Sequence, residues 1–415
     1  VKFNMSGYDD VDLRNFGGQK KKRTAFAQSD TGKQIMTAMI DAVRRKEASG
    51  MVERFSHHSF LTLRLCGNIC CGCVIRDEYS QETVELPGDA VIVATGGMHG
   101  LFGNTTGSLS NTGEVTAELF RLGVPLANVE MIQYHPTTVE CGGKRMLISE
   151  AARGEGGRLF AMKDGKQWYF MEEKYPELGN LMPRDIPARE IWKVSHESEV
   201  FLDMTEISEE IISNKLTGLA DDCMTYLHKD IRKEPVSVLP GIHYFMGGIL
   251  VDEQHRTPIQ NLCAAGECCA QYHGANRLGG NSLLGALYGG RVAAKSACEQ
   301  ADVVDLSCAT QIDFPPTSQI SEIKQLNKVM QETMGVVRNE NTLLNGIQTV
   351  QALTGNLPLL GMAVLKSALA RKESRGAHWR EDYPKNNDDD YLKTTVARFD
   401  GKQIQISFVP VPERR

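Results

Sequence analysis

The sequence has no apolar run long enough to cross a bilayer, which takes about 18 or more consecutive apolar residues. Its first residues, VKFNMSGYDD, lack the apolar core of a signal peptide. Basic residues are not in excess, because 46 lysines and arginines face 52 aspartates and glutamates, a net charge of −6. A nucleic-acid-binding domain is usually clearly basic. The sequence therefore predicts a protein that neither spans a membrane, nor is exported, nor binds nucleic acid.

Paired metal-binding motifs are also lacking. Eleven cysteines are present, and seven of them form two clusters, at 66–73 and 263–269. Neither cluster has two paired CxxC motifs, both lie in strand-like apolar stretches, and no nearby histidine completes a tetrahedral set. We therefore expect buried thiols in a reducing compartment and no metal.

The chain of 415 residues exceeds the size at which one hydrophobic core stops growing, so two to four domains are expected. No internal repeat or low-complexity tract is present. From about 130 to 240 the chain carries more charge and proline and fewer β-branched runs. This change predicts an inserted α+β domain within an α/β domain.

Local patterns predict several elements. The segment that starts at Gly32 has apolar residues at helical spacing, and Gly50 suits its end. Residues 60–77 predict two strands about a Gly67-Asn68 turn. The run from Ala90 to Ala94 has the unbroken apolar character of a strand that is buried on both faces in a parallel sheet. A helix is expected to begin near Thr112, and a helical segment to run from about Gln319 to Ala370, followed by a β-like end.

The segment from Pro240 to Gly290 concentrates glycines around a histidine, an arginine and a Gly-Glu pair. Glycine lets backbone N–H groups approach a ligand closely. From Asn281 the residues predict a helix whose N-terminal N–H groups can face that ligand. The Thr95-Gly96-Gly97 turn follows the apolar strand at 90–94, where open α/β sheets bind nucleotides.

Seven collinear segments resemble the flavoprotein subunits of succinate dehydrogenase and fumarate reductase. They are QYHPT at 133–137, SEAARGEGG at 149–157, PRDIPAR at 183–189, HYFMGG at 243–248, AGE at 265–267, GANRLGGNSL at 274–283 and RKESRGAH at 371–378. Each is weak alone, but their common order over almost the whole chain makes a chance similarity implausible.

The resemblance implies an α/β plus α+β fold with FAD as cofactor. An incomplete, Rossmann-like FAD-binding domain (1–130 and 241–300) would be interrupted by a capping domain (131–240). A helical domain (315–377) and a C-terminal segment (378–415) would follow.

The resemblance also implies the site residues. The dicarboxylate-binding positions are His135, Ser149, His243 and Arg277. The proton-donating arginine is Arg184, with Glu150 and Arg153 as its proton relay. FAD contacts fall on Thr95, Gly96, Gly97, Glu114, Glu267, Ser282 and Leu283.

These residue types suit the chemistry. A buried dicarboxylate needs charge-assisted donors, and Arg277 offers a planar fork that fits a carboxylate. Guanidinium is effectively always protonated, so Arg184 can donate only if the proton returns at once. Spacing alone favours a simpler interpretation, a Glu150–Arg153 ion pair that braces the cap. His57, His58, His99, His255, His273 and His378 receive no functional role here.

The chain departs from the family pattern. It has no G-x-G-x-x-G turn for the FAD pyrophosphate, and FGGQ at 16–19 already resembles a later part of the family. We therefore expect a chain that lacks the N-terminal dinucleotide-binding segment and, purified alone, binds FAD weakly or not at all. A stoichiometric flavin absorbance would contradict this expectation.

The favoured function is interconversion of succinate and fumarate, with electrons passed to an iron–sulfur subunit, because the chain shows no cluster or haem motif. We expect a cytoplasmic location, peripheral at the inner face of the cell membrane through other subunits. Two alternatives remain, an enzyme similar to L-aspartate oxidase and a catalytically silent fragment or assembly module. The direction of catalysis, the quinone and covalent flavin attachment do not follow from the sequence.

Overall fold

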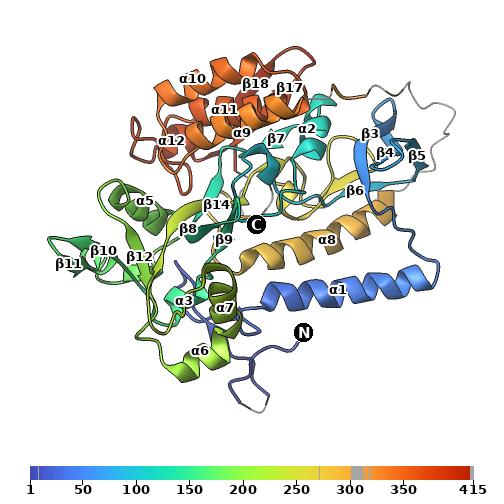
Figure 1. Ribbon diagram of the computed structural model, residues 1–415. Helices are drawn as coiled ribbons and strands as arrows, with labels where there is room; N and C mark the ends of the chain where they lie inside the picture. Colours follow the sequence, from blue (N-terminus) through green and yellow to red (C-terminus); the bar gives the residue numbers. More distant parts are fainter. Residues whose placement is uncertain (8, 271, 301–311, 313, 317–318, 412–415) are drawn as a thin grey trace. The chain divides into compact units, whose positions relative to one another are not determined.

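The computed structural model describes residues 1–7, 9–270, 272–300, 312, 314–316 and 319–411 (Figure 1). The chain divides into two compact units. Unit 1 consists of Val1–Ser56, Tyr134–Gly241 and Leu278–Leu283, and unit 2 of His57–Gln133, Ile242–Arg277 and Leu284–Arg415. Each unit is therefore assembled from segments that are far apart in the sequence.

Unit 1 is built on an antiparallel sheet of four strands in the order β11–β10–β12–β13. Their bounds are Lys166–Trp168, Arg158–Lys163, Val200–Asp203 and Val236–Ser237. Apolar side chains of β10 and β12, such as Leu159 and its partner Leu202, enter a single core. Short helices complete that core: α3 (Ala151–Gly154), α4 (Phe170–Lys174), α5 (Asp185–Val194), α6 (Glu209–Lys215) and α7 (Thr217–Asp222).

Two strands carry the chain between the units. β8 (Ile132–Cys141) enters unit 1 and β14 (Leu239–Phe245) leaves it, and with β9 (Lys144–Leu147) they form a sheet in the order β14–β8–β9. β8 and β9 pair antiparallel through a turn at Gly142-Gly143, whose φ angles of 61° and 78° favour glycine.

The N-terminal part of unit 1 contains a small hairpin and one long helix. The hairpin pairs β1 (Leu13–Arg14) with β2 (Thr24–Ala25). The predicted helix is confirmed as α1 (Thr31–Ala48), and Gly50 follows it with a φ of 74°. No residue of α1 is buried, and its apolar side chains, such as Met36 and Val43, are about half exposed.

Unit 2 begins with an antiparallel sheet of β3 (His58–Cys66), β4 (Ile69–Asp77) and β5 (Thr83–Pro87). The predicted pair of strands about Gly67-Asn68 is thus confirmed. Cys70 and Cys71 are buried free thiols. The thiol prediction is wrong at Cys66, which is disulfide-bonded.

The predicted apolar strand is β6 (Val91–Val93), and it pairs in parallel with β16 (Leu262–Ala264). The expectation that it is buried on both faces is wrong, because Ile92 is 40% exposed. Among the described residues these two strands form a sheet by themselves, so no further strand extends the sheet beside β6. The sequence of residues 90–94 showed that this strand is apolar, but it could not show how many strands lie beside it.

The predicted helical segment contains three helices, α9 (Ile320–Thr333), α10 (Glu340–Gln351) and α11 (Asn356–Ala370). α11 is the most buried, and it packs on α9, α10 and α2 (Glu114–Arg121), which begins where the sequence predicts a helix. A Cβ at Gly361 of α11 would lie 3.2 Å from a methyl carbon of Leu326 on α9. Glycine therefore allows the two helices to approach closely.

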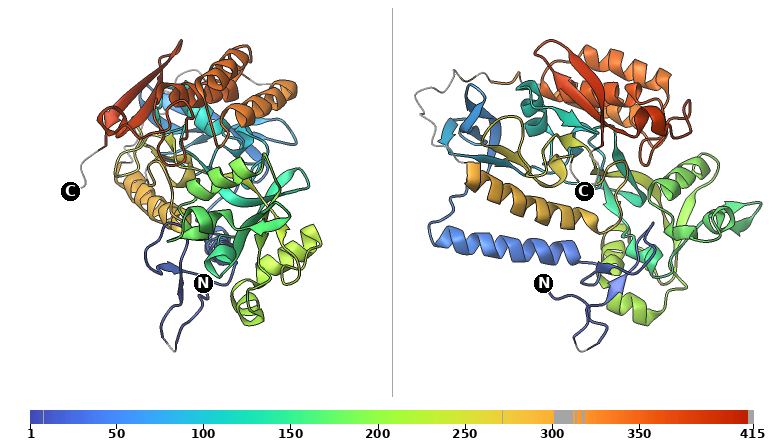
Figure 2. Two further views of the ribbon diagram at one scale, coloured as in Figure 1. Left: turned by 90° about the vertical axis from the view of Figure 1, so that its left-hand side faces the viewer. Right: turned by 180° about the vertical axis from the view of Figure 1, so that it is seen from behind.

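A further sheet of unit 2 runs in the order β15–β7–β17–β18. Its strands are Gly248–Ile249, Leu126–Ala127, Lys393–Phe399 and Ile404–Pro410, and the short helix α12 (Asp388–Tyr391) precedes β17. β17 and β18 contact α11, and both views of Figure 2 place this hairpin beside the orange helices. The predicted β-like end is therefore confirmed and joins unit 2.

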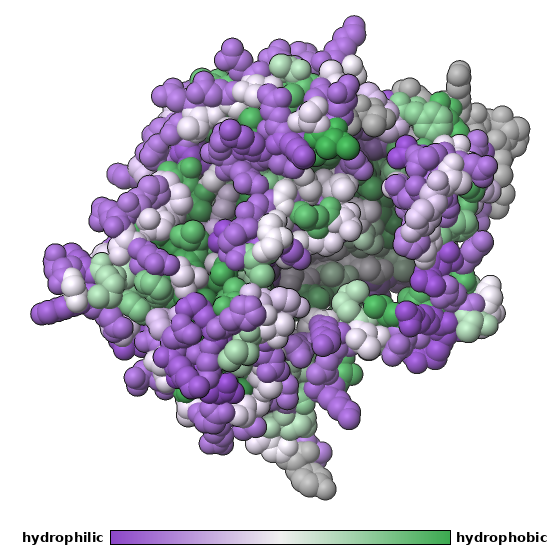
Figure 3. All heavy atoms as spheres, in the orientation of Figure 1, coloured by the Kyte–Doolittle hydropathy of each residue, from purple (hydrophilic) through white to green (hydrophobic). Residues whose placement is uncertain are grey.

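The remaining long helix is α8 (Asn281–Gln300), which begins where the sequence predicts. Within the described ranges, every helix is too short or too polar to cross a lipid bilayer. Figure 3 shows a face on which hydrophilic residues predominate and hydrophobic residues form small groups. That distribution agrees with the ordinary charged content of 24%.

Candidate active site

A buried carboxylate joins two arginines in unit 1. Oε2 of Glu150 accepts hydrogen bonds from Arg184 Nε at 2.9 Å and Nη2 at 2.6 Å, and Oε1 lies 3.3 Å from Arg153 Nη2. All three side chains are at least 94% buried. Glu150 directly precedes α3 and Arg153 lies in it, so the predicted spacing of three residues does bring them together. Arg184 directly precedes α5.

Two glycines form the walls around the Glu150 carboxylate. The N–H of Gly17 donates to Oε1 at 2.9 Å. A Cβ at Gly17 would lie 2.6 Å from Oε1, and a Cβ at Gly279 would lie 2.5 Å from Oε2. Any side chain at either position would therefore displace the carboxylate. Sequence reasoning missed this role, although both residues lie in segments, FGGQ and GANRLGG, that it singled out.

The surroundings keep Glu150 ionised. Burial alone would raise the pKa of Glu150, but the charges of Arg184 and Arg153 and the hydrogen bonds from Arg184 and Gly17 outweigh it, so the pKa is lowered. Burial lowers the pKa of Arg153, and the neighbouring Arg184 charge acts in the same direction. Each group touches the next, so the three side chains form one continuous buried cluster.

Two further predicted residues lie in unit 1 and are held through Thr137. His135 is fully buried on β8, with its Nδ1 3.1 Å from the carbonyl oxygen of Thr137. The Thr137 hydroxyl donates to the carbonyl of Ile148 at 3.0 Å, and the Ile148 N–H donates back to Thr137 at 3.1 Å. Ser149 follows Ile148, and its Oγ accepts the N–H of Ala151 at 3.2 Å. The strand with His135 is therefore tied to the segment that carries Ser149 and Glu150.

Arg277 and His243 lie in unit 2. The guanidinium carbon of Arg277 is 4.3 Å from the ring centroid of Tyr244, a cation–π contact, and the side chain is 97% buried. Gln133 donates to the carbonyl of Arg277 at 2.7 Å and so fixes its backbone. The Nδ1 of His243 lies 2.7 Å from the hydroxyl of Thr106.

Burial and the Arg277 charge lower the pKa of nearby His273 to about 4. His273 is therefore neutral beside this arginine at pH 7. Its Nε2 lies 3.2 Å from the Tyr244 hydroxyl, so it helps to hold the ring on which Arg277 rests.

Glu267 is an acidic residue at the C-terminal ends of the two parallel strands. It follows β16, and its Oε1 accepts the N–H of Phe245 at 3.0 Å. A Cβ at Gly97 would lie 2.7 Å from the same oxygen and 2.6 Å from the Phe245 ring. Gly97 follows β6, so the ends of both strands meet at Glu267, as the sequence predicts for this type of sheet.

These residues fit FAD in their chemistry. The Glu267 side chain is 20% exposed, and ribose hydroxyls are donors that a carboxylate can accept. The flanking Gly96 and Gly266 have φ angles of 72° and 78°, a backbone conformation that favours glycine at both strand ends. Glu114 is exposed at the first position of α2, and Thr95 is exposed beside Gly96.

Ser282 and Leu283 belong to unit 1 and occupy the first turn of α8. The first N–H groups of a helix have no partner within it, so this turn can donate to an anionic or polar ligand. The sequence-based assignment of these two residues remains a prediction.

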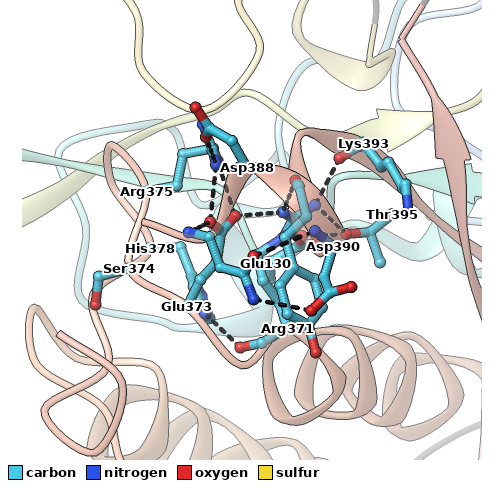
Figure 4. Close-up of polar contacts among 12 residues, drawn as sticks. Glu130, Arg371, Glu373, Ser374, Arg375, His378, Asp388, Asp390, Lys393 and Thr395 are labelled. Carbon is cyan, nitrogen blue, oxygen red and sulfur yellow. Dashed lines mark hydrogen bonds and ion pairs between the residues drawn. The ribbon is translucent and has the colours of Figure 1, made fainter. Parts of the chain in front are cut away.

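The RKESRGAH segment forms a buried network of ion pairs and hydrogen bonds within unit 2. Figure 4 shows Arg371 and Glu373 among polar partners from several parts of the chain. Glu373 accepts from Arg371 at 2.7 Å and from Arg375 at 2.8 Å, and Arg375 also pairs with Asp388 at 2.5 Å. Arg371, Glu373 and His378 are all fully buried. The motif therefore anchors the C-terminal segment within unit 2.

Two family descriptions match this chain. The one named FAD binding domain matches residues 1–283, and the one named Fumarate reductase flavoprotein C-term matches residues 353–414. The first covers more than half of the chain.

Curated relatives give the same result. The succinate dehydrogenase flavoprotein subunit of Bacillus subtilis (strain 168) is 35% identical, over 100% of this chain and 81% of its own length. The 8-methylmenaquinol:fumarate reductase flavoprotein subunit of Wolinella succinogenes is 31% identical, over 98% of this chain and 75% of its own.

Solved structures are similar as well. The FrdA protein of E. coli quinol fumarate reductase has a TM-score of 0.87 and 26% identity, covering 99% of this chain and 80% of its own. A chain of the Mycobacterium smegmatis Sdh1 complex has a TM-score of 0.75 and 27% identity, covering 100% and 78%. The fold is thus that of these flavoproteins, with mixed helices and sheets.

The chain belongs to the family of succinate dehydrogenase and fumarate reductase flavoprotein subunits. The resemblance inferred from the seven motifs is confirmed. The family assigns oxidoreductase as the class of enzyme and FAD as the cofactor.

Proposed function

We propose that this protein interconverts succinate and fumarate, with Arg184 as the group that exchanges a proton with the substrate. The observation that carries the proposal is the buried Glu150 carboxylate held between Arg184 and Arg153. A guanidinium gives up a proton only at high cost, so an acid of this kind needs a partner that restores the proton at once. Glu150 contacts Arg184 through two hydrogen bonds and meets that need.

Four residues are proposed to bind the dicarboxylate. Arg277 offers a bidentate fork to one carboxylate, and its contact with Tyr244 limits the directions in which the fork can point. His135, Ser149 and His243 add donors for the other carboxylate. Such donors can twist that carboxylate out of conjugation with the alkene of fumarate, which makes the reacting carbon more electrophilic.

Proton transfer is proposed to run through the cluster of unit 1. In fumarate reduction Arg184 donates a proton to the substrate carbon, and Glu150 and Arg153 return one to it. In succinate oxidation the same groups accept and remove the proton. Because Glu150 is ionised and touches both arginines, it can pass a proton between them.

FAD, when bound, supplies the hydride exchange with the substrate carbon. We propose that Thr95, Gly96, Gly97, Glu114, Glu267, Ser282 and Leu283 hold it. In the same proposal residues 1–130 and 241–300 form the FAD-binding domain and 131–240 a capping domain, followed by a helical domain (315–377) and a C-terminal segment (378–415).

Relatives are named as subunits, and one solved neighbour belongs to a complex. We propose that this chain also works with an iron–sulfur subunit that receives or supplies electrons. Association with a membrane would then be indirect, through further subunits at the inner face of the cell membrane.

The test is a side-by-side assay of the flavin-loaded protein with succinate, fumarate and L-aspartate. Artificial electron acceptors and donors replace the protein partner, and peroxide formation is recorded for aspartate. We expect turnover with both dicarboxylates and none with aspartate. Oxidation of aspartate without turnover of the dicarboxylates would overturn the proposal.

A further inference from the structure

We propose that His99 is a positioning residue that joins the flavin-side carboxylate of Glu267 to the substrate-side imidazole of His243. All three residues lie in unit 2, as do the two threonines between them. The inference rests on the proposed function for the roles of Glu267 and His243, but its geometry stands independently.

His99 has a polar contact on each side of its ring. It is 98% buried in the first turn after the Thr95-Gly96-Gly97 segment. Its Nδ1 lies 3.0 Å from the hydroxyl oxygen of Thr105. Its Nε2 lies 3.6 Å from Oε1 of Glu267, a distance typical of an electrostatic contact rather than a hydrogen bond.

Thr105 is held by a backbone hydrogen bond in addition to its contact with His99. The N–H of Gly107 donates to the Thr105 oxygen at 3.3 Å. The Thr105 hydroxyl can accept this bond and still donate its own proton, and we assign that proton to Nδ1 of His99 because Nε2 is the ring nitrogen that faces the Glu267 carboxylate. The remaining ring proton then lies on Nε2 and points toward the carboxylate of Glu267.

The next residue, Thr106, makes the contacts that lead to His243. Its hydroxyl lies 2.7 Å from Nδ1 of His243. Its backbone N–H donates to the carbonyl of Ile242 at 3.0 Å, so the loop is also fixed to the strand that carries His243. A movement of Thr105 therefore changes the position of the Thr106 hydroxyl, and with it the orientation of the His243 ring.

Packing leaves the His99 ring little freedom. A Cβ at Gly107 would lie 2.2 Å from Cε1 of His99, so the ring rests directly on the backbone there. The ring of Phe245 meets it edge-on at 5.0 Å between centroids. The N–H of Phe245 also donates to Oε1 of Glu267, which fixes the same carboxylate from a second side.

The test compares three variants with the unchanged protein. His99→Leu removes both polar contacts, His99→Gln keeps a donor near the position of Nε2, and Thr106→Val removes only the contact to His243. His196→Gln is the matched control, because His196 is an exposed histidine of unit 1. The measurements are the dissociation constant for added FAD, KM and kcat for fumarate, and the ring-nitrogen NMR signals of His243.

His99→Leu is expected to weaken FAD binding about tenfold, the effect of losing one contact to a charged group. It should also raise the KM for fumarate more than it lowers kcat, and shift the His243 signals. His99→Gln should restore FAD binding to within about threefold of the unchanged protein. Thr106→Val should raise KM and leave FAD binding as it was.

The inference is overturned if His99→Leu leaves both FAD binding and the His243 signals unchanged, or if His99→Gln is as damaging as His99→Leu. The NMR signals need neither substrate nor turnover. If the unchanged protein does not act on dicarboxylates, the proposed function fails, while the link from His99 to His243 through Thr105 and Thr106 is still tested by these signals.

Discussion

Nε of Arg371 lies 2.8 Å from Oε1 of Glu130, although the two residues are 241 positions apart, and both side chains are fully buried. The other nitrogens of Arg371 donate to Glu373, to the carbonyls of Tyr391 and Lys393, and to the Thr395 hydroxyl. One guanidinium thus ties the segment before β8 to the end of α11 and to β17. Two buried carboxylates contact this cation, and one of them, Glu373, is also paired with Arg375.

Arg371→Met should therefore destabilise unit 2 strongly. The change leaves Glu130 and Glu373 buried with less positive charge beside them, and removing one partner of a buried pair costs about 3–5 kcal/mol. Denaturant unfolding followed by circular dichroism measures the loss. Arg398→Met is the matched control, because Arg398 is exposed on β17 and donates only a long hydrogen bond of 3.4 Å to Ser407. Equal stability of the two variants would show that the buried network contributes nothing.

Glu150→Gln should lower turnover of fumarate by about 10²- to 10⁴-fold, the usual contribution of general acid–base catalysis. The amide keeps the shape of the side chain but cannot return a proton to Arg184. KM should change little, since Glu150 is not proposed to bind substrate. Glu190→Gln is the control, since Glu190 is also a buried carboxylate of unit 1 and pairs with Lys174 at 2.6 Å. If both variants lose activity equally, the effect belongs to stability.

Gly97→Ala should weaken FAD binding about tenfold, because the added Cβ displaces the Glu267 carboxylate or the Phe245 ring. Flavin fluorescence quenching during an FAD titration measures the dissociation constant. Gly290→Ala serves as the control, since a Cβ at this position of α8 meets no atom within 4 Å. That variant should bind FAD normally and gain up to about 1 kcal/mol from its better helix propensity. Normal binding by Gly97→Ala would remove Glu267 from the proposed site.

Acid should destabilise the fold through the buried His378 and the half-buried His273. Burial and the charges of Arg338, Arg371 and Arg380 hold the pKa of His378 well below its usual range. The pKa of His273 is lowered from 6.5 to about 4 by burial and by Arg277. Between pH 6.5 and 4 the unfolded chain binds protons at these two residues and the folded chain does not. The free energy of unfolding therefore decreases as the pH is lowered, by at most about 1.4 kcal/mol per pH unit for each histidine.

The measurement is the unfolding temperature from pH 7 to pH 5. His378→Asn and His273→Gln should each flatten this dependence, because each removes one group that titrates only in the unfolded chain. His196→Gln should leave it unchanged, since His196 is exposed. An unchanged slope in both the His378→Asn and the His273→Gln variant would contradict the assignment.

Local sequence signals predicted the local elements well. Gly67-Asn68 marked the turn between β3 and β4, and the apolar spacing after Gly32 marked α1. Exposure was less predictable, because it depends on which segments pack together. Ile92 was expected to be buried but lies in a strand with one parallel neighbour.

In the site too, contacts between residues close in sequence were predictable, and contacts made only by the folded chain were not. Glu150 and Arg153 could be paired from their spacing, and the family motif added Arg184. The glycines that flank the carboxylate, Gly17 and Gly279, could not be assigned, since only the folded chain brings them to Glu150. His99 gave no signal, because nothing in its sequence neighbours reports the contact with Glu267.

The walls around Glu150 come from Gly17 and Gly279, which lie on opposite sides of it in the sequence. During synthesis, a ribosome that has passed Gly17 but not yet reached Gly279 has supplied one wall and not the other. Glu130 likewise gains its ion-pair partner only after Arg371 has been synthesised. Each unit therefore contains a buried carboxylate whose contacts are completed late in translation. The nascent chain must therefore stay open for most of its synthesis, and chaperones that hold such chains should bind it for longer than they bind a protein whose units fold in sequence order.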